Sequence, residues 1–172
     1  MIQFNILKNQ KVTLVYTLLA LLIAIPVLLI AAGQLGMLTG SLPANMGVTD
    51  GKLKTLSATR NSVSSQAKLY PDHPMNSFAA IDALPSMGDT AASMGRLLTA
   101  LQTMPGVRIT VQQSDYLRAE ASTKILGFVD DLEFWFNPQA QVIELRSASR
   151  LGREDFGTNR KRIEAIRAAY QH

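Results

Sequence analysis

The chain of 172 residues contains no cysteine and only two histidines, His73 and the terminal His172. Without cysteine there is no disulfide, no iron–sulfur or cysteine-ligated zinc site, no thiol nucleophile and no lipid-anchored cysteine. Two histidines are too few for a histidine metal cluster. The sequence therefore predicts no disulfide and no metal site, and we expect no cofactor.

Charged side chains are also scarce, at 17% of the residues against 47% hydrophobic ones. Most of this imbalance comes from residues 12–32, which include no Asp, Glu, Lys, Arg or His. The rest of the chain, about 140 residues, has the composition of an ordinary soluble domain and is long enough to bury a core. This distribution excludes a disordered tail, a coiled coil and a multi-span transporter.

The apolar run at residues 12–32 is long enough to cross a membrane. Its roughly 21 residues, at about 1.5 Å per residue, match the ~30 Å hydrocarbon core of a bilayer. The apolar region of a cleaved signal peptide is shorter, roughly 7–15 residues, and only Ala31 and Gly33 could form its small-residue cleavage pair. We therefore predict an uncleaved transmembrane helix, with a cleaved signal peptide as the alternative.

The positive charges around this run predict its orientation. Lys8, Lys11 and the amino terminus precede it, whereas residues 33–51 contain no Lys or Arg. The positive-inside rule then puts the N-terminus in the cytoplasm and the C-terminal domain outside, which is the periplasm in a Gram-negative-type cell. The sequence thus divides into a cytoplasmic N-terminus and transmembrane helix (1–33), a linker (34–50) and an exported domain (51–172).

Periodicity in the exported domain predicts an α+β fold. Residues 47–85 show no clear period, and we expect an irregular but ordered loop. A helix follows the N-cap candidate Asp89 and ends at Pro105, and a second helix covers residues 158–170. Between them lie four runs with strand-like alternation, at residues 107–112, 117–122, 126–136 and 142–148. We predict an antiparallel sheet of about four strands packed by helices.

Asp130 is anomalous within the third of these runs. Perfect alternation places it on the same face as the apolar Leu132 and Phe134. A carboxylate does not enter a core without a partner. Either a bulge at Asp130 and Asp131 turns both outward, or Asp130 is buried against a cation or several backbone N–H groups.

A second acidic group lies on the opposite face of the same strand. Regular geometry points the carboxylates of Asp131 and Glu133 the same way, and Arg146 and Arg150 on the next run supply counter-charges. We favour a cross-strand ion-pair network that fixes the register of the strands. A binding site is the second interpretation. Acid/base catalysis is the third, because no nucleophile, histidine or metal signature accompanies the two carboxylates.

Other polar groups favour structural interpretations. The basic residues of the last helix could contact anionic lipid headgroups or a partner, but a solvated face is favoured. Serines 62, 64 and 65 have no activating base nearby, so a serine nucleophile is not favoured. An exported domain of near-neutral charge offers no basic groove for nucleic acid, and we expect no nucleic-acid partner.

Four ordered motifs resemble those of the domain-of-unknown-function family 1499: residues 61–66 (NSVSSQ), 126–134 (LGFVDDLEF), 146–152 (RSASRLG) and 155–164 (DFGTNRKRIE). The resemblance covers roughly residues 51–169. It implies an exported, lipid-anchored or membrane-anchored bacterial protein of no established activity, with relatives in plastids. Relatives usually have a cysteine where this chain has Ser62, and another near Leu56, so a disulfide or reactive-thiol role does not carry over. The family supplies no catalytic residue, and the motif positions define a candidate binding surface: Asp130, Asp131, Glu133, Arg146, Arg150, Asn159 and Arg162.

We therefore predict a single-pass inner-membrane protein with a periplasmic, non-enzymatic binding or accessory domain. One form of this hypothesis is an accessory subunit of a membrane complex, whose span packs on a partner through small residues such as Ala20 and Ala24. The alternative is a hydrolase or ligand-binding domain for an envelope polymer or lipid, centred on Asp131, Glu133, Arg146 and Arg150. A cation-binding structural domain is a third possibility, and it requires the acidic side chains to be free of arginine partners.

Overall fold

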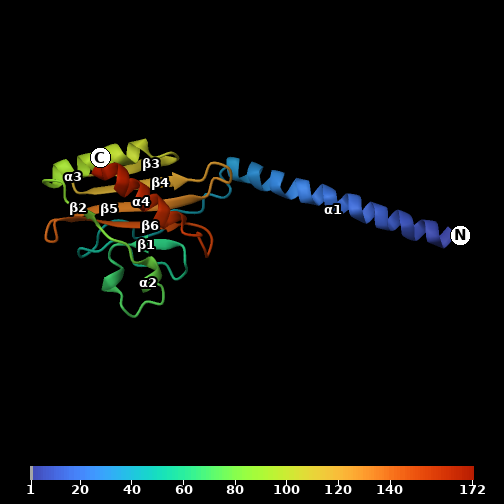
Figure 1. The fold of residues 1–172 in the computed structure, drawn as a ribbon, viewed down its shortest axis with the longest axis horizontal. Coiled ribbons are helices and arrows are strands. Elements are labelled where there is room, and N and C mark those ends of the chain that lie inside the picture. The colour runs from blue at the N-terminus through green and yellow to red at the C-terminus, as the bar shows by residue number, and fades with distance from the viewer. Residues whose placement is uncertain (1) are drawn as a thin grey trace.

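The computed structural model describes the backbone of residues 2–172 and the side chains of residues 10–172. It begins with one long helix, α1 (Ile2–Gln34), which projects away from the folded domain (Figure 1). Within Gln10–Gln34 of α1, the most apolar window of 18 residues has a mean hydropathy of 2.8, and none of that window is buried against protein. By length and composition, α1 contains a candidate membrane span, as the apolar run predicted.

The domain is built on an antiparallel sheet of six strands. The chain forms β3 (Val107–Gln112), β4 (Tyr116–Ser122), β5 (Val129–Asn137) and β6 (Val142–Ser149) as consecutive neighbours. Two short strands, β1 (Ser62–Ser64) and β2 (Leu84–Pro85), both pair with the free edge of β6. The predicted α+β class and antiparallel sheet are confirmed. The two extra strands were not predicted because runs of three and two residues are too short to show a period.

Two helices cover one face of the sheet, and they are the two that the sequence predicts: α3 (Thr90–Thr103) and α4 (Thr158–Gln171). The Asp89 side chain caps α3 by accepting a hydrogen bond from the N–H of Ala92 at 2.8 Å. The core between the helices and the sheet is apolar and fully buried, and it includes Leu97, Leu101, Leu132, Phe134, Leu145, Ile163 and Ile166.

Residues 47–85 are ordered by polar contacts as well as by scattered buried apolar side chains. Besides β1 and β2 they contain a short 3-10 helix, η1 (Ala67–Leu69), and one turn of α-helix, α2 (Asn76–Ala79). The Asn76 amide donates to the carbonyls of Ala67 and Tyr70, at 2.6 and 2.9 Å, and so joins the two turns. Hydrogen bonds of this kind do not require apolar residues at regular spacing, so the sequence shows no periodicity here.

The opposite face of the sheet is covered by irregular chain, residues 40–57, which we call the covering segment. Val48 and Leu53 pack there against Tyr116 and Trp135 of the sheet. The segment turns at Asp50-Gly51, both at positive φ, between the mutually hydrogen-bonded Thr49 and Lys52. The Gln66 side chain accepts from the N–H of Leu53 at 2.8 Å and donates to the carbonyl of Gly51 at 2.9 Å, which holds the turn down.

Candidate functional site

Asp130 lies on the helix-covered face of the sheet and is 4% exposed. The register of β5 with both neighbours is regular there, so no bulge turns the side chain outward. Its Oδ2 instead accepts a hydrogen bond from Nη2 of Arg162, on α4, at 2.7 Å. Of the two arrangements considered for Asp130, the structure has the one in which a cation meets a buried carboxylate.

Asn159 connects the start of α4 to the edge of the sheet. Its side chain is fully buried, and its amide donates to the carbonyl of Asn61, to Ser149 Oγ and to Asp155 Oδ2, at 3.1, 3.1 and 2.8 Å. Its Oδ1 accepts hydrogen bonds from Ser147 and Arg162. Every polar atom of this amide has a partner, and those partners come from β6, from α4, from the residue before β1 and from the loop before α4. The contacts fix where α4 begins.

On the opposite face, a chain of alternating charges runs from β3 across β4 and β5 to Arg150, the residue after β6. Arg150 donates two hydrogen bonds to Asp131, at 2.7 and 2.8 Å, and a third to Glu120, which also accepts from Arg108 at 2.6 Å. The hydrogen bonds to Asp131 raise the pKa of Arg150, although its burial opposes the rise. Burial by itself would raise the pKa of Glu120, but Arg150 and then Arg108 outweigh it and lower that pKa.

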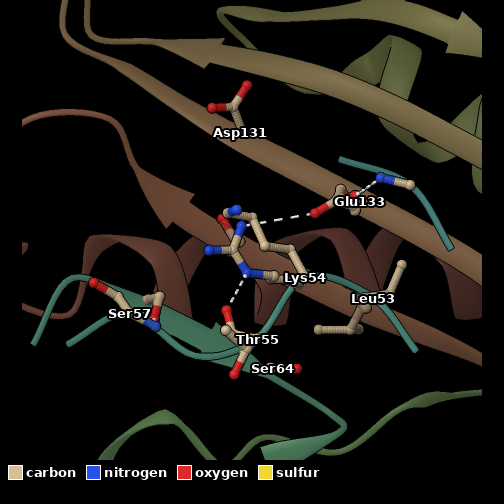
Figure 2. A network of polar contacts seen from close by, with 12 residues as sticks. Leu53, Lys54, Thr55, Ser57, Ser64, Asp131 and Glu133 are labelled. Carbon is tan, nitrogen blue, oxygen red and sulfur yellow. Dashed lines mark hydrogen bonds and ion pairs between the residues drawn. The ribbon is translucent and has the colours of Figure 1, made fainter. Parts of the chain in front are cut away.

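Glu133 lies at the centre of the same face and is 0% exposed (Figure 2). Its Oε1 accepts from the N–H of Gly47 at 2.7 Å and from the hydroxyl of Tyr116 at 2.9 Å. Its other oxygen, Oε2, lies 3.7 Å from Nη1 of Arg146, and neither atom has a hydrogen-bond partner. Arg146 also donates from Nε to the carbonyl of Thr55 at 3.2 Å. Glu133 and Arg146 therefore both hold the covering segment.

Burial changes the acidity of two groups beside Glu133. It raises the pKa of the Tyr116 hydroxyl, and the negative charge and hydrogen bond of Glu133 raise it further. Burial lowers the pKa of Arg146, and the charges of Glu133 and Asp131 oppose that change. At neutral pH the phenol is protonated and serves as a hydrogen-bond donor to the carboxylate.

The seven predicted site residues form two groups, separated by the sheet. Residues directly opposite each other in neighbouring strands share a face. The sheet register and the contacts then place Asp130, Asn159 and Arg162 on the helix side, and Asp131, Glu133, Arg146 and Arg150 under the covering segment. In both groups each carboxylate is matched by an arginine. Such an arrangement can hold strands in register and clamp irregular chain against the sheet.

Most of these residues lie away from the surface hollows of the domain. Of five surface cavities formed by the described residues, one has Asp130 in its wall, and the other six predicted residues line none of the five. Among the described residues, no three His, Asp or Glu side chains are arranged to hold a metal ion.

One polar cavity of about 640 Å³ involves residues that the sequence analysis did not group together. It lies at the edge of β6 between β1 and β2, and Ser65, Lys68, Glu144 and Arg160 line it. Ser65 donates to Glu144 at 2.5 Å and accepts from the N–H of Leu145 at 2.8 Å. Because 79 residues separate Ser65 from Glu144, no local pattern connects them, and only the proximity of β1 to β6 does.

Fold and site together define a class: a small α+β domain with a polar network on each face of its sheet, carried on an apolar N-terminal helix. A family model described as "Protein of unknown function (DUF1499)" matches residues 52–170, and the chain belongs to this family. No curated protein sequence matches the chain significantly. The match spans the whole sheet with α3 and α4, whereas α1 and residues 40–51 of the covering segment precede it.

Proposed function

We propose that this is a single-pass inner-membrane protein whose domain acts on the periplasmic side as a non-enzymatic binding or accessory module. The junction between α1 and the domain is the observation that carries the proposal. Gln34 donates from its side chain to the carbonyls of Lys124 and Ile125, at 3.1 and 2.8 Å, and Gly33 is buried against the backbone of Leu126. A helix joined to its domain in this way holds the domain at a fixed height beside the bilayer, as docking to a membrane partner requires.

The hydrogen bonds and the burial of the Asp131 and Glu133 carboxylates favour a binding or accessory role over a hydrolase. A general base needs a free lone pair within reach of a substrate proton. Both oxygens of Asp131 accept from Arg150, and Glu133 Oε1 accepts two hydrogen bonds. Glu133 Oε2 has no hydrogen-bond partner, but it is fully buried and faces Arg146 at 3.7 Å, out of reach of a substrate. The hydrolase or ligand-binding alternative therefore requires the covering segment to move away first. A cation site on this face is also disfavoured, because Glu120, Asp131 and Glu133 each already face an arginine.

The topology can be tested with single cysteines, since the chain has none of its own. Gln139→Cys places a thiol in the exposed turn after β5, and Gln10→Cys places one at the start of the candidate span. In intact spheroplasts a membrane-impermeant maleimide should label the cysteine at 139, and the cysteine at 10 only after lysis. The reverse pattern would contradict the orientation. A mature chain that begins beyond Gly33 would contradict a retained anchor.

The accessory role can be tested by co-purification. The tagged full-length protein is extracted from native membranes in mild detergent, and proteins that accompany it are quantified. The matched control carries the same domain on an unrelated span of equal length, which keeps the anchor and removes the α1 surface. We expect a membrane protein that co-purifies with the native chain and is depleted in the control. Migration of the native chain as a monomer without a companion would count against an accessory subunit.

A further inference from the structure

Exposed apolar side chains of the domain gather at one end. Outside α1, eight large apolar side chains of the described residues are exposed, and seven of them lie in three short segments. The segments are residues 35–42, 125–128 and 151–156, and only Leu69 lies elsewhere. The last two segments contribute four side chains, which we call the apolar rim: Ile125 (60% exposed), Phe128 (36%), Leu151 (43%) and Phe156 (85%).

The apolar rim lies at the end of the sheet from which α1 departs. β4 and β6 are each antiparallel to β5, so the loops that follow them, residues 123–128 and 150–157, lie at the same end of the sheet (Figure 1). The first loop touches the last turn of α1, where the backbones of Gly33 and Gly127 lie close together. A Cβ atom on Gly127 would lie only 2.7 Å from the carbonyl oxygen of Gly33. Gly40, just beyond α1, is packed against the side chain of Leu151 in the second loop.

The loop that presents Phe156 is held in an unfavourable backbone conformation. Phe156 has φ of 52°, in the left-handed region that a bulky L-residue rarely adopts. The Asp155 carboxylate keeps the loop in place by accepting from the N–H groups of Gly157 and Asn159, each at 2.9 Å. Backbone strain that the surroundings maintain is typical of functional positions. Here it places a phenyl ring at 85% exposure, beside Phe128 and Leu151 in the wall of one cavity of about 350 Å³.

We propose that the apolar rim inserts into the outer-leaflet interface of the membrane that α1 crosses. This inference rests on the proposed function, because it requires α1 to be a transmembrane helix. The candidate span ends at Gln34, and a bilayer core takes about 20 helical residues, so the junction lies at the level of the lipid headgroups. Insertion removes the apolar side chains of the rim from water, which is favourable. Each loop also carries one exposed cation, Lys124 or Arg153, at the level of the lipid phosphates, which attract positive charge. The domain is then fixed to the bilayer at α1 and at both loops.

The test uses the full chain in vesicles of phosphatidylethanolamine and phosphatidylglycerol, with a fluorophore on a single introduced cysteine. Glu154→Cys reports on the second loop and leaves the apolar rim intact, because Glu154 only pairs with the exposed Arg60. Gln139→Cys, at the opposite end of the sheet, is the water-exposed control, and Leu22→Cys in α1 is the lipid-exposed control. Side chains that insert into the membrane interface lie about 5–10 Å into the boundary between headgroups and acyl chains. A lipid that carries a spin label near the top of its acyl chain should therefore quench the fluorophore at 154 at least about twofold more than the fluorophore at 139.

A second substitution tests whether the apolar rim itself holds the loop at the membrane. In the Glu154→Cys background, Phe156→Ser should remove about half of the lipid quenching, because it removes the most exposed apolar side chain of the rim. Leu69→Ser, which removes an exposed apolar side chain from η1, should leave the quenching unchanged. Equal effects of the two serine substitutions would overturn the proposal.

The remaining outcomes separate this proposal from the one on which it rests. If the label at 22 is shielded from water while the labels at 154 and 139 behave alike, α1 spans the bilayer and the apolar rim does not touch it. If the fluorescence of the label at 22 shows that it remains in water, α1 is not inserted, and both proposals fail. If the fluorophore at 154 is shielded from water but is not quenched by the spin-labelled lipid, a protein surface covers the apolar rim. That result would overturn the lipid proposal.

Discussion

Glu133 Oε2 and Arg146 Nη1 face each other at 3.7 Å beneath the covering segment, and neither atom has a hydrogen-bond partner. Glu133 Oε1 and Arg146 Nε hold the covering segment, by bonding Gly47 and Thr55. A buried pair of this kind contributes little net stability, because the cost of removing both charges from water is close to what their attraction returns. The main effect of the pair is on the position of the covering segment, because the two side chains bind it at Gly47 and Thr55.

Removing both members of this pair should lower the free energy of unfolding by clearly less than the sum of the two single removals. Arg146→Met leaves the buried Glu133 carboxylate without its cation and should lower the free energy of unfolding by about 3 kcal/mol. The double variant with Glu133→Gln should lose clearly less than the sum of the two single variants. The measurement is chemical denaturation of the full-length protein in mild detergent. Arg108→Met is the matched control, and because its side chain is 73% exposed it should cost less than about 1 kcal/mol.

Tyr116→Phe should change the response to alkaline pH. The folded protein holds the phenol proton above the ordinary pKa of 10.0, so the stability of the native chain should fall as pH rises past about 10, where the unfolded chain releases that proton. The variant should show a shallower decline. At pH 7 it should lose about 1 kcal/mol, the hydrogen bond to Glu133. Melting temperatures across a pH series test both statements, and identical slopes would contradict the first.

Glu120→Gln should change the response to acid. Because its arginine partners lower the pKa of Glu120 below 4.5, the folded state resists protonation that the unfolded chain accepts. The stability from this carboxylate is therefore complete above about pH 4.5 and is lost as the pH falls further. The variant should show a flatter loss of melting temperature between neutral and acidic pH. Glu164→Gln, on the exposed side of α4, is the control for removing a carboxylate, and equal slopes for the two variants would contradict the prediction.

Gly33→Ala and Gly95→Ala form a matched pair with opposite expected outcomes. A Cβ on Gly33 would overlap the backbone of Leu126, so the substitution should separate α1 from the domain, lower the melting temperature and speed trypsin cleavage of the chain after Lys124. Gly95 lies within α3 and a Cβ there would meet nothing within 4 Å, so alanine should stabilise the protein by about 0.5–1 kcal/mol. Equal melting temperatures for the two variants would show that the junction is not tightly packed.

Much of the fold was predictable because its signals are local. The apolar run of α1, the four long strands and the helices α3 and α4 each have a period or a length that a single segment reveals. The Asp89 cap and the shared face of Asp131 and Glu133 follow from spacing alone. The short strands β1 and β2 have no such signal, because they exist only through their pairing with β6.

By itself the sequence determined the class of fold, the apolar helix and the motif positions that carry the family resemblance. Tertiary structure alone decided that Asp130 meets Arg162 across the core, that the seven motif residues are divided by the sheet, and that the apolar rim collects beside the end of α1. Periodicity assigns a side chain to a face within one segment. Which segments then share that face depends on strand register and on contacts between residues far apart in the chain, which no local pattern contains.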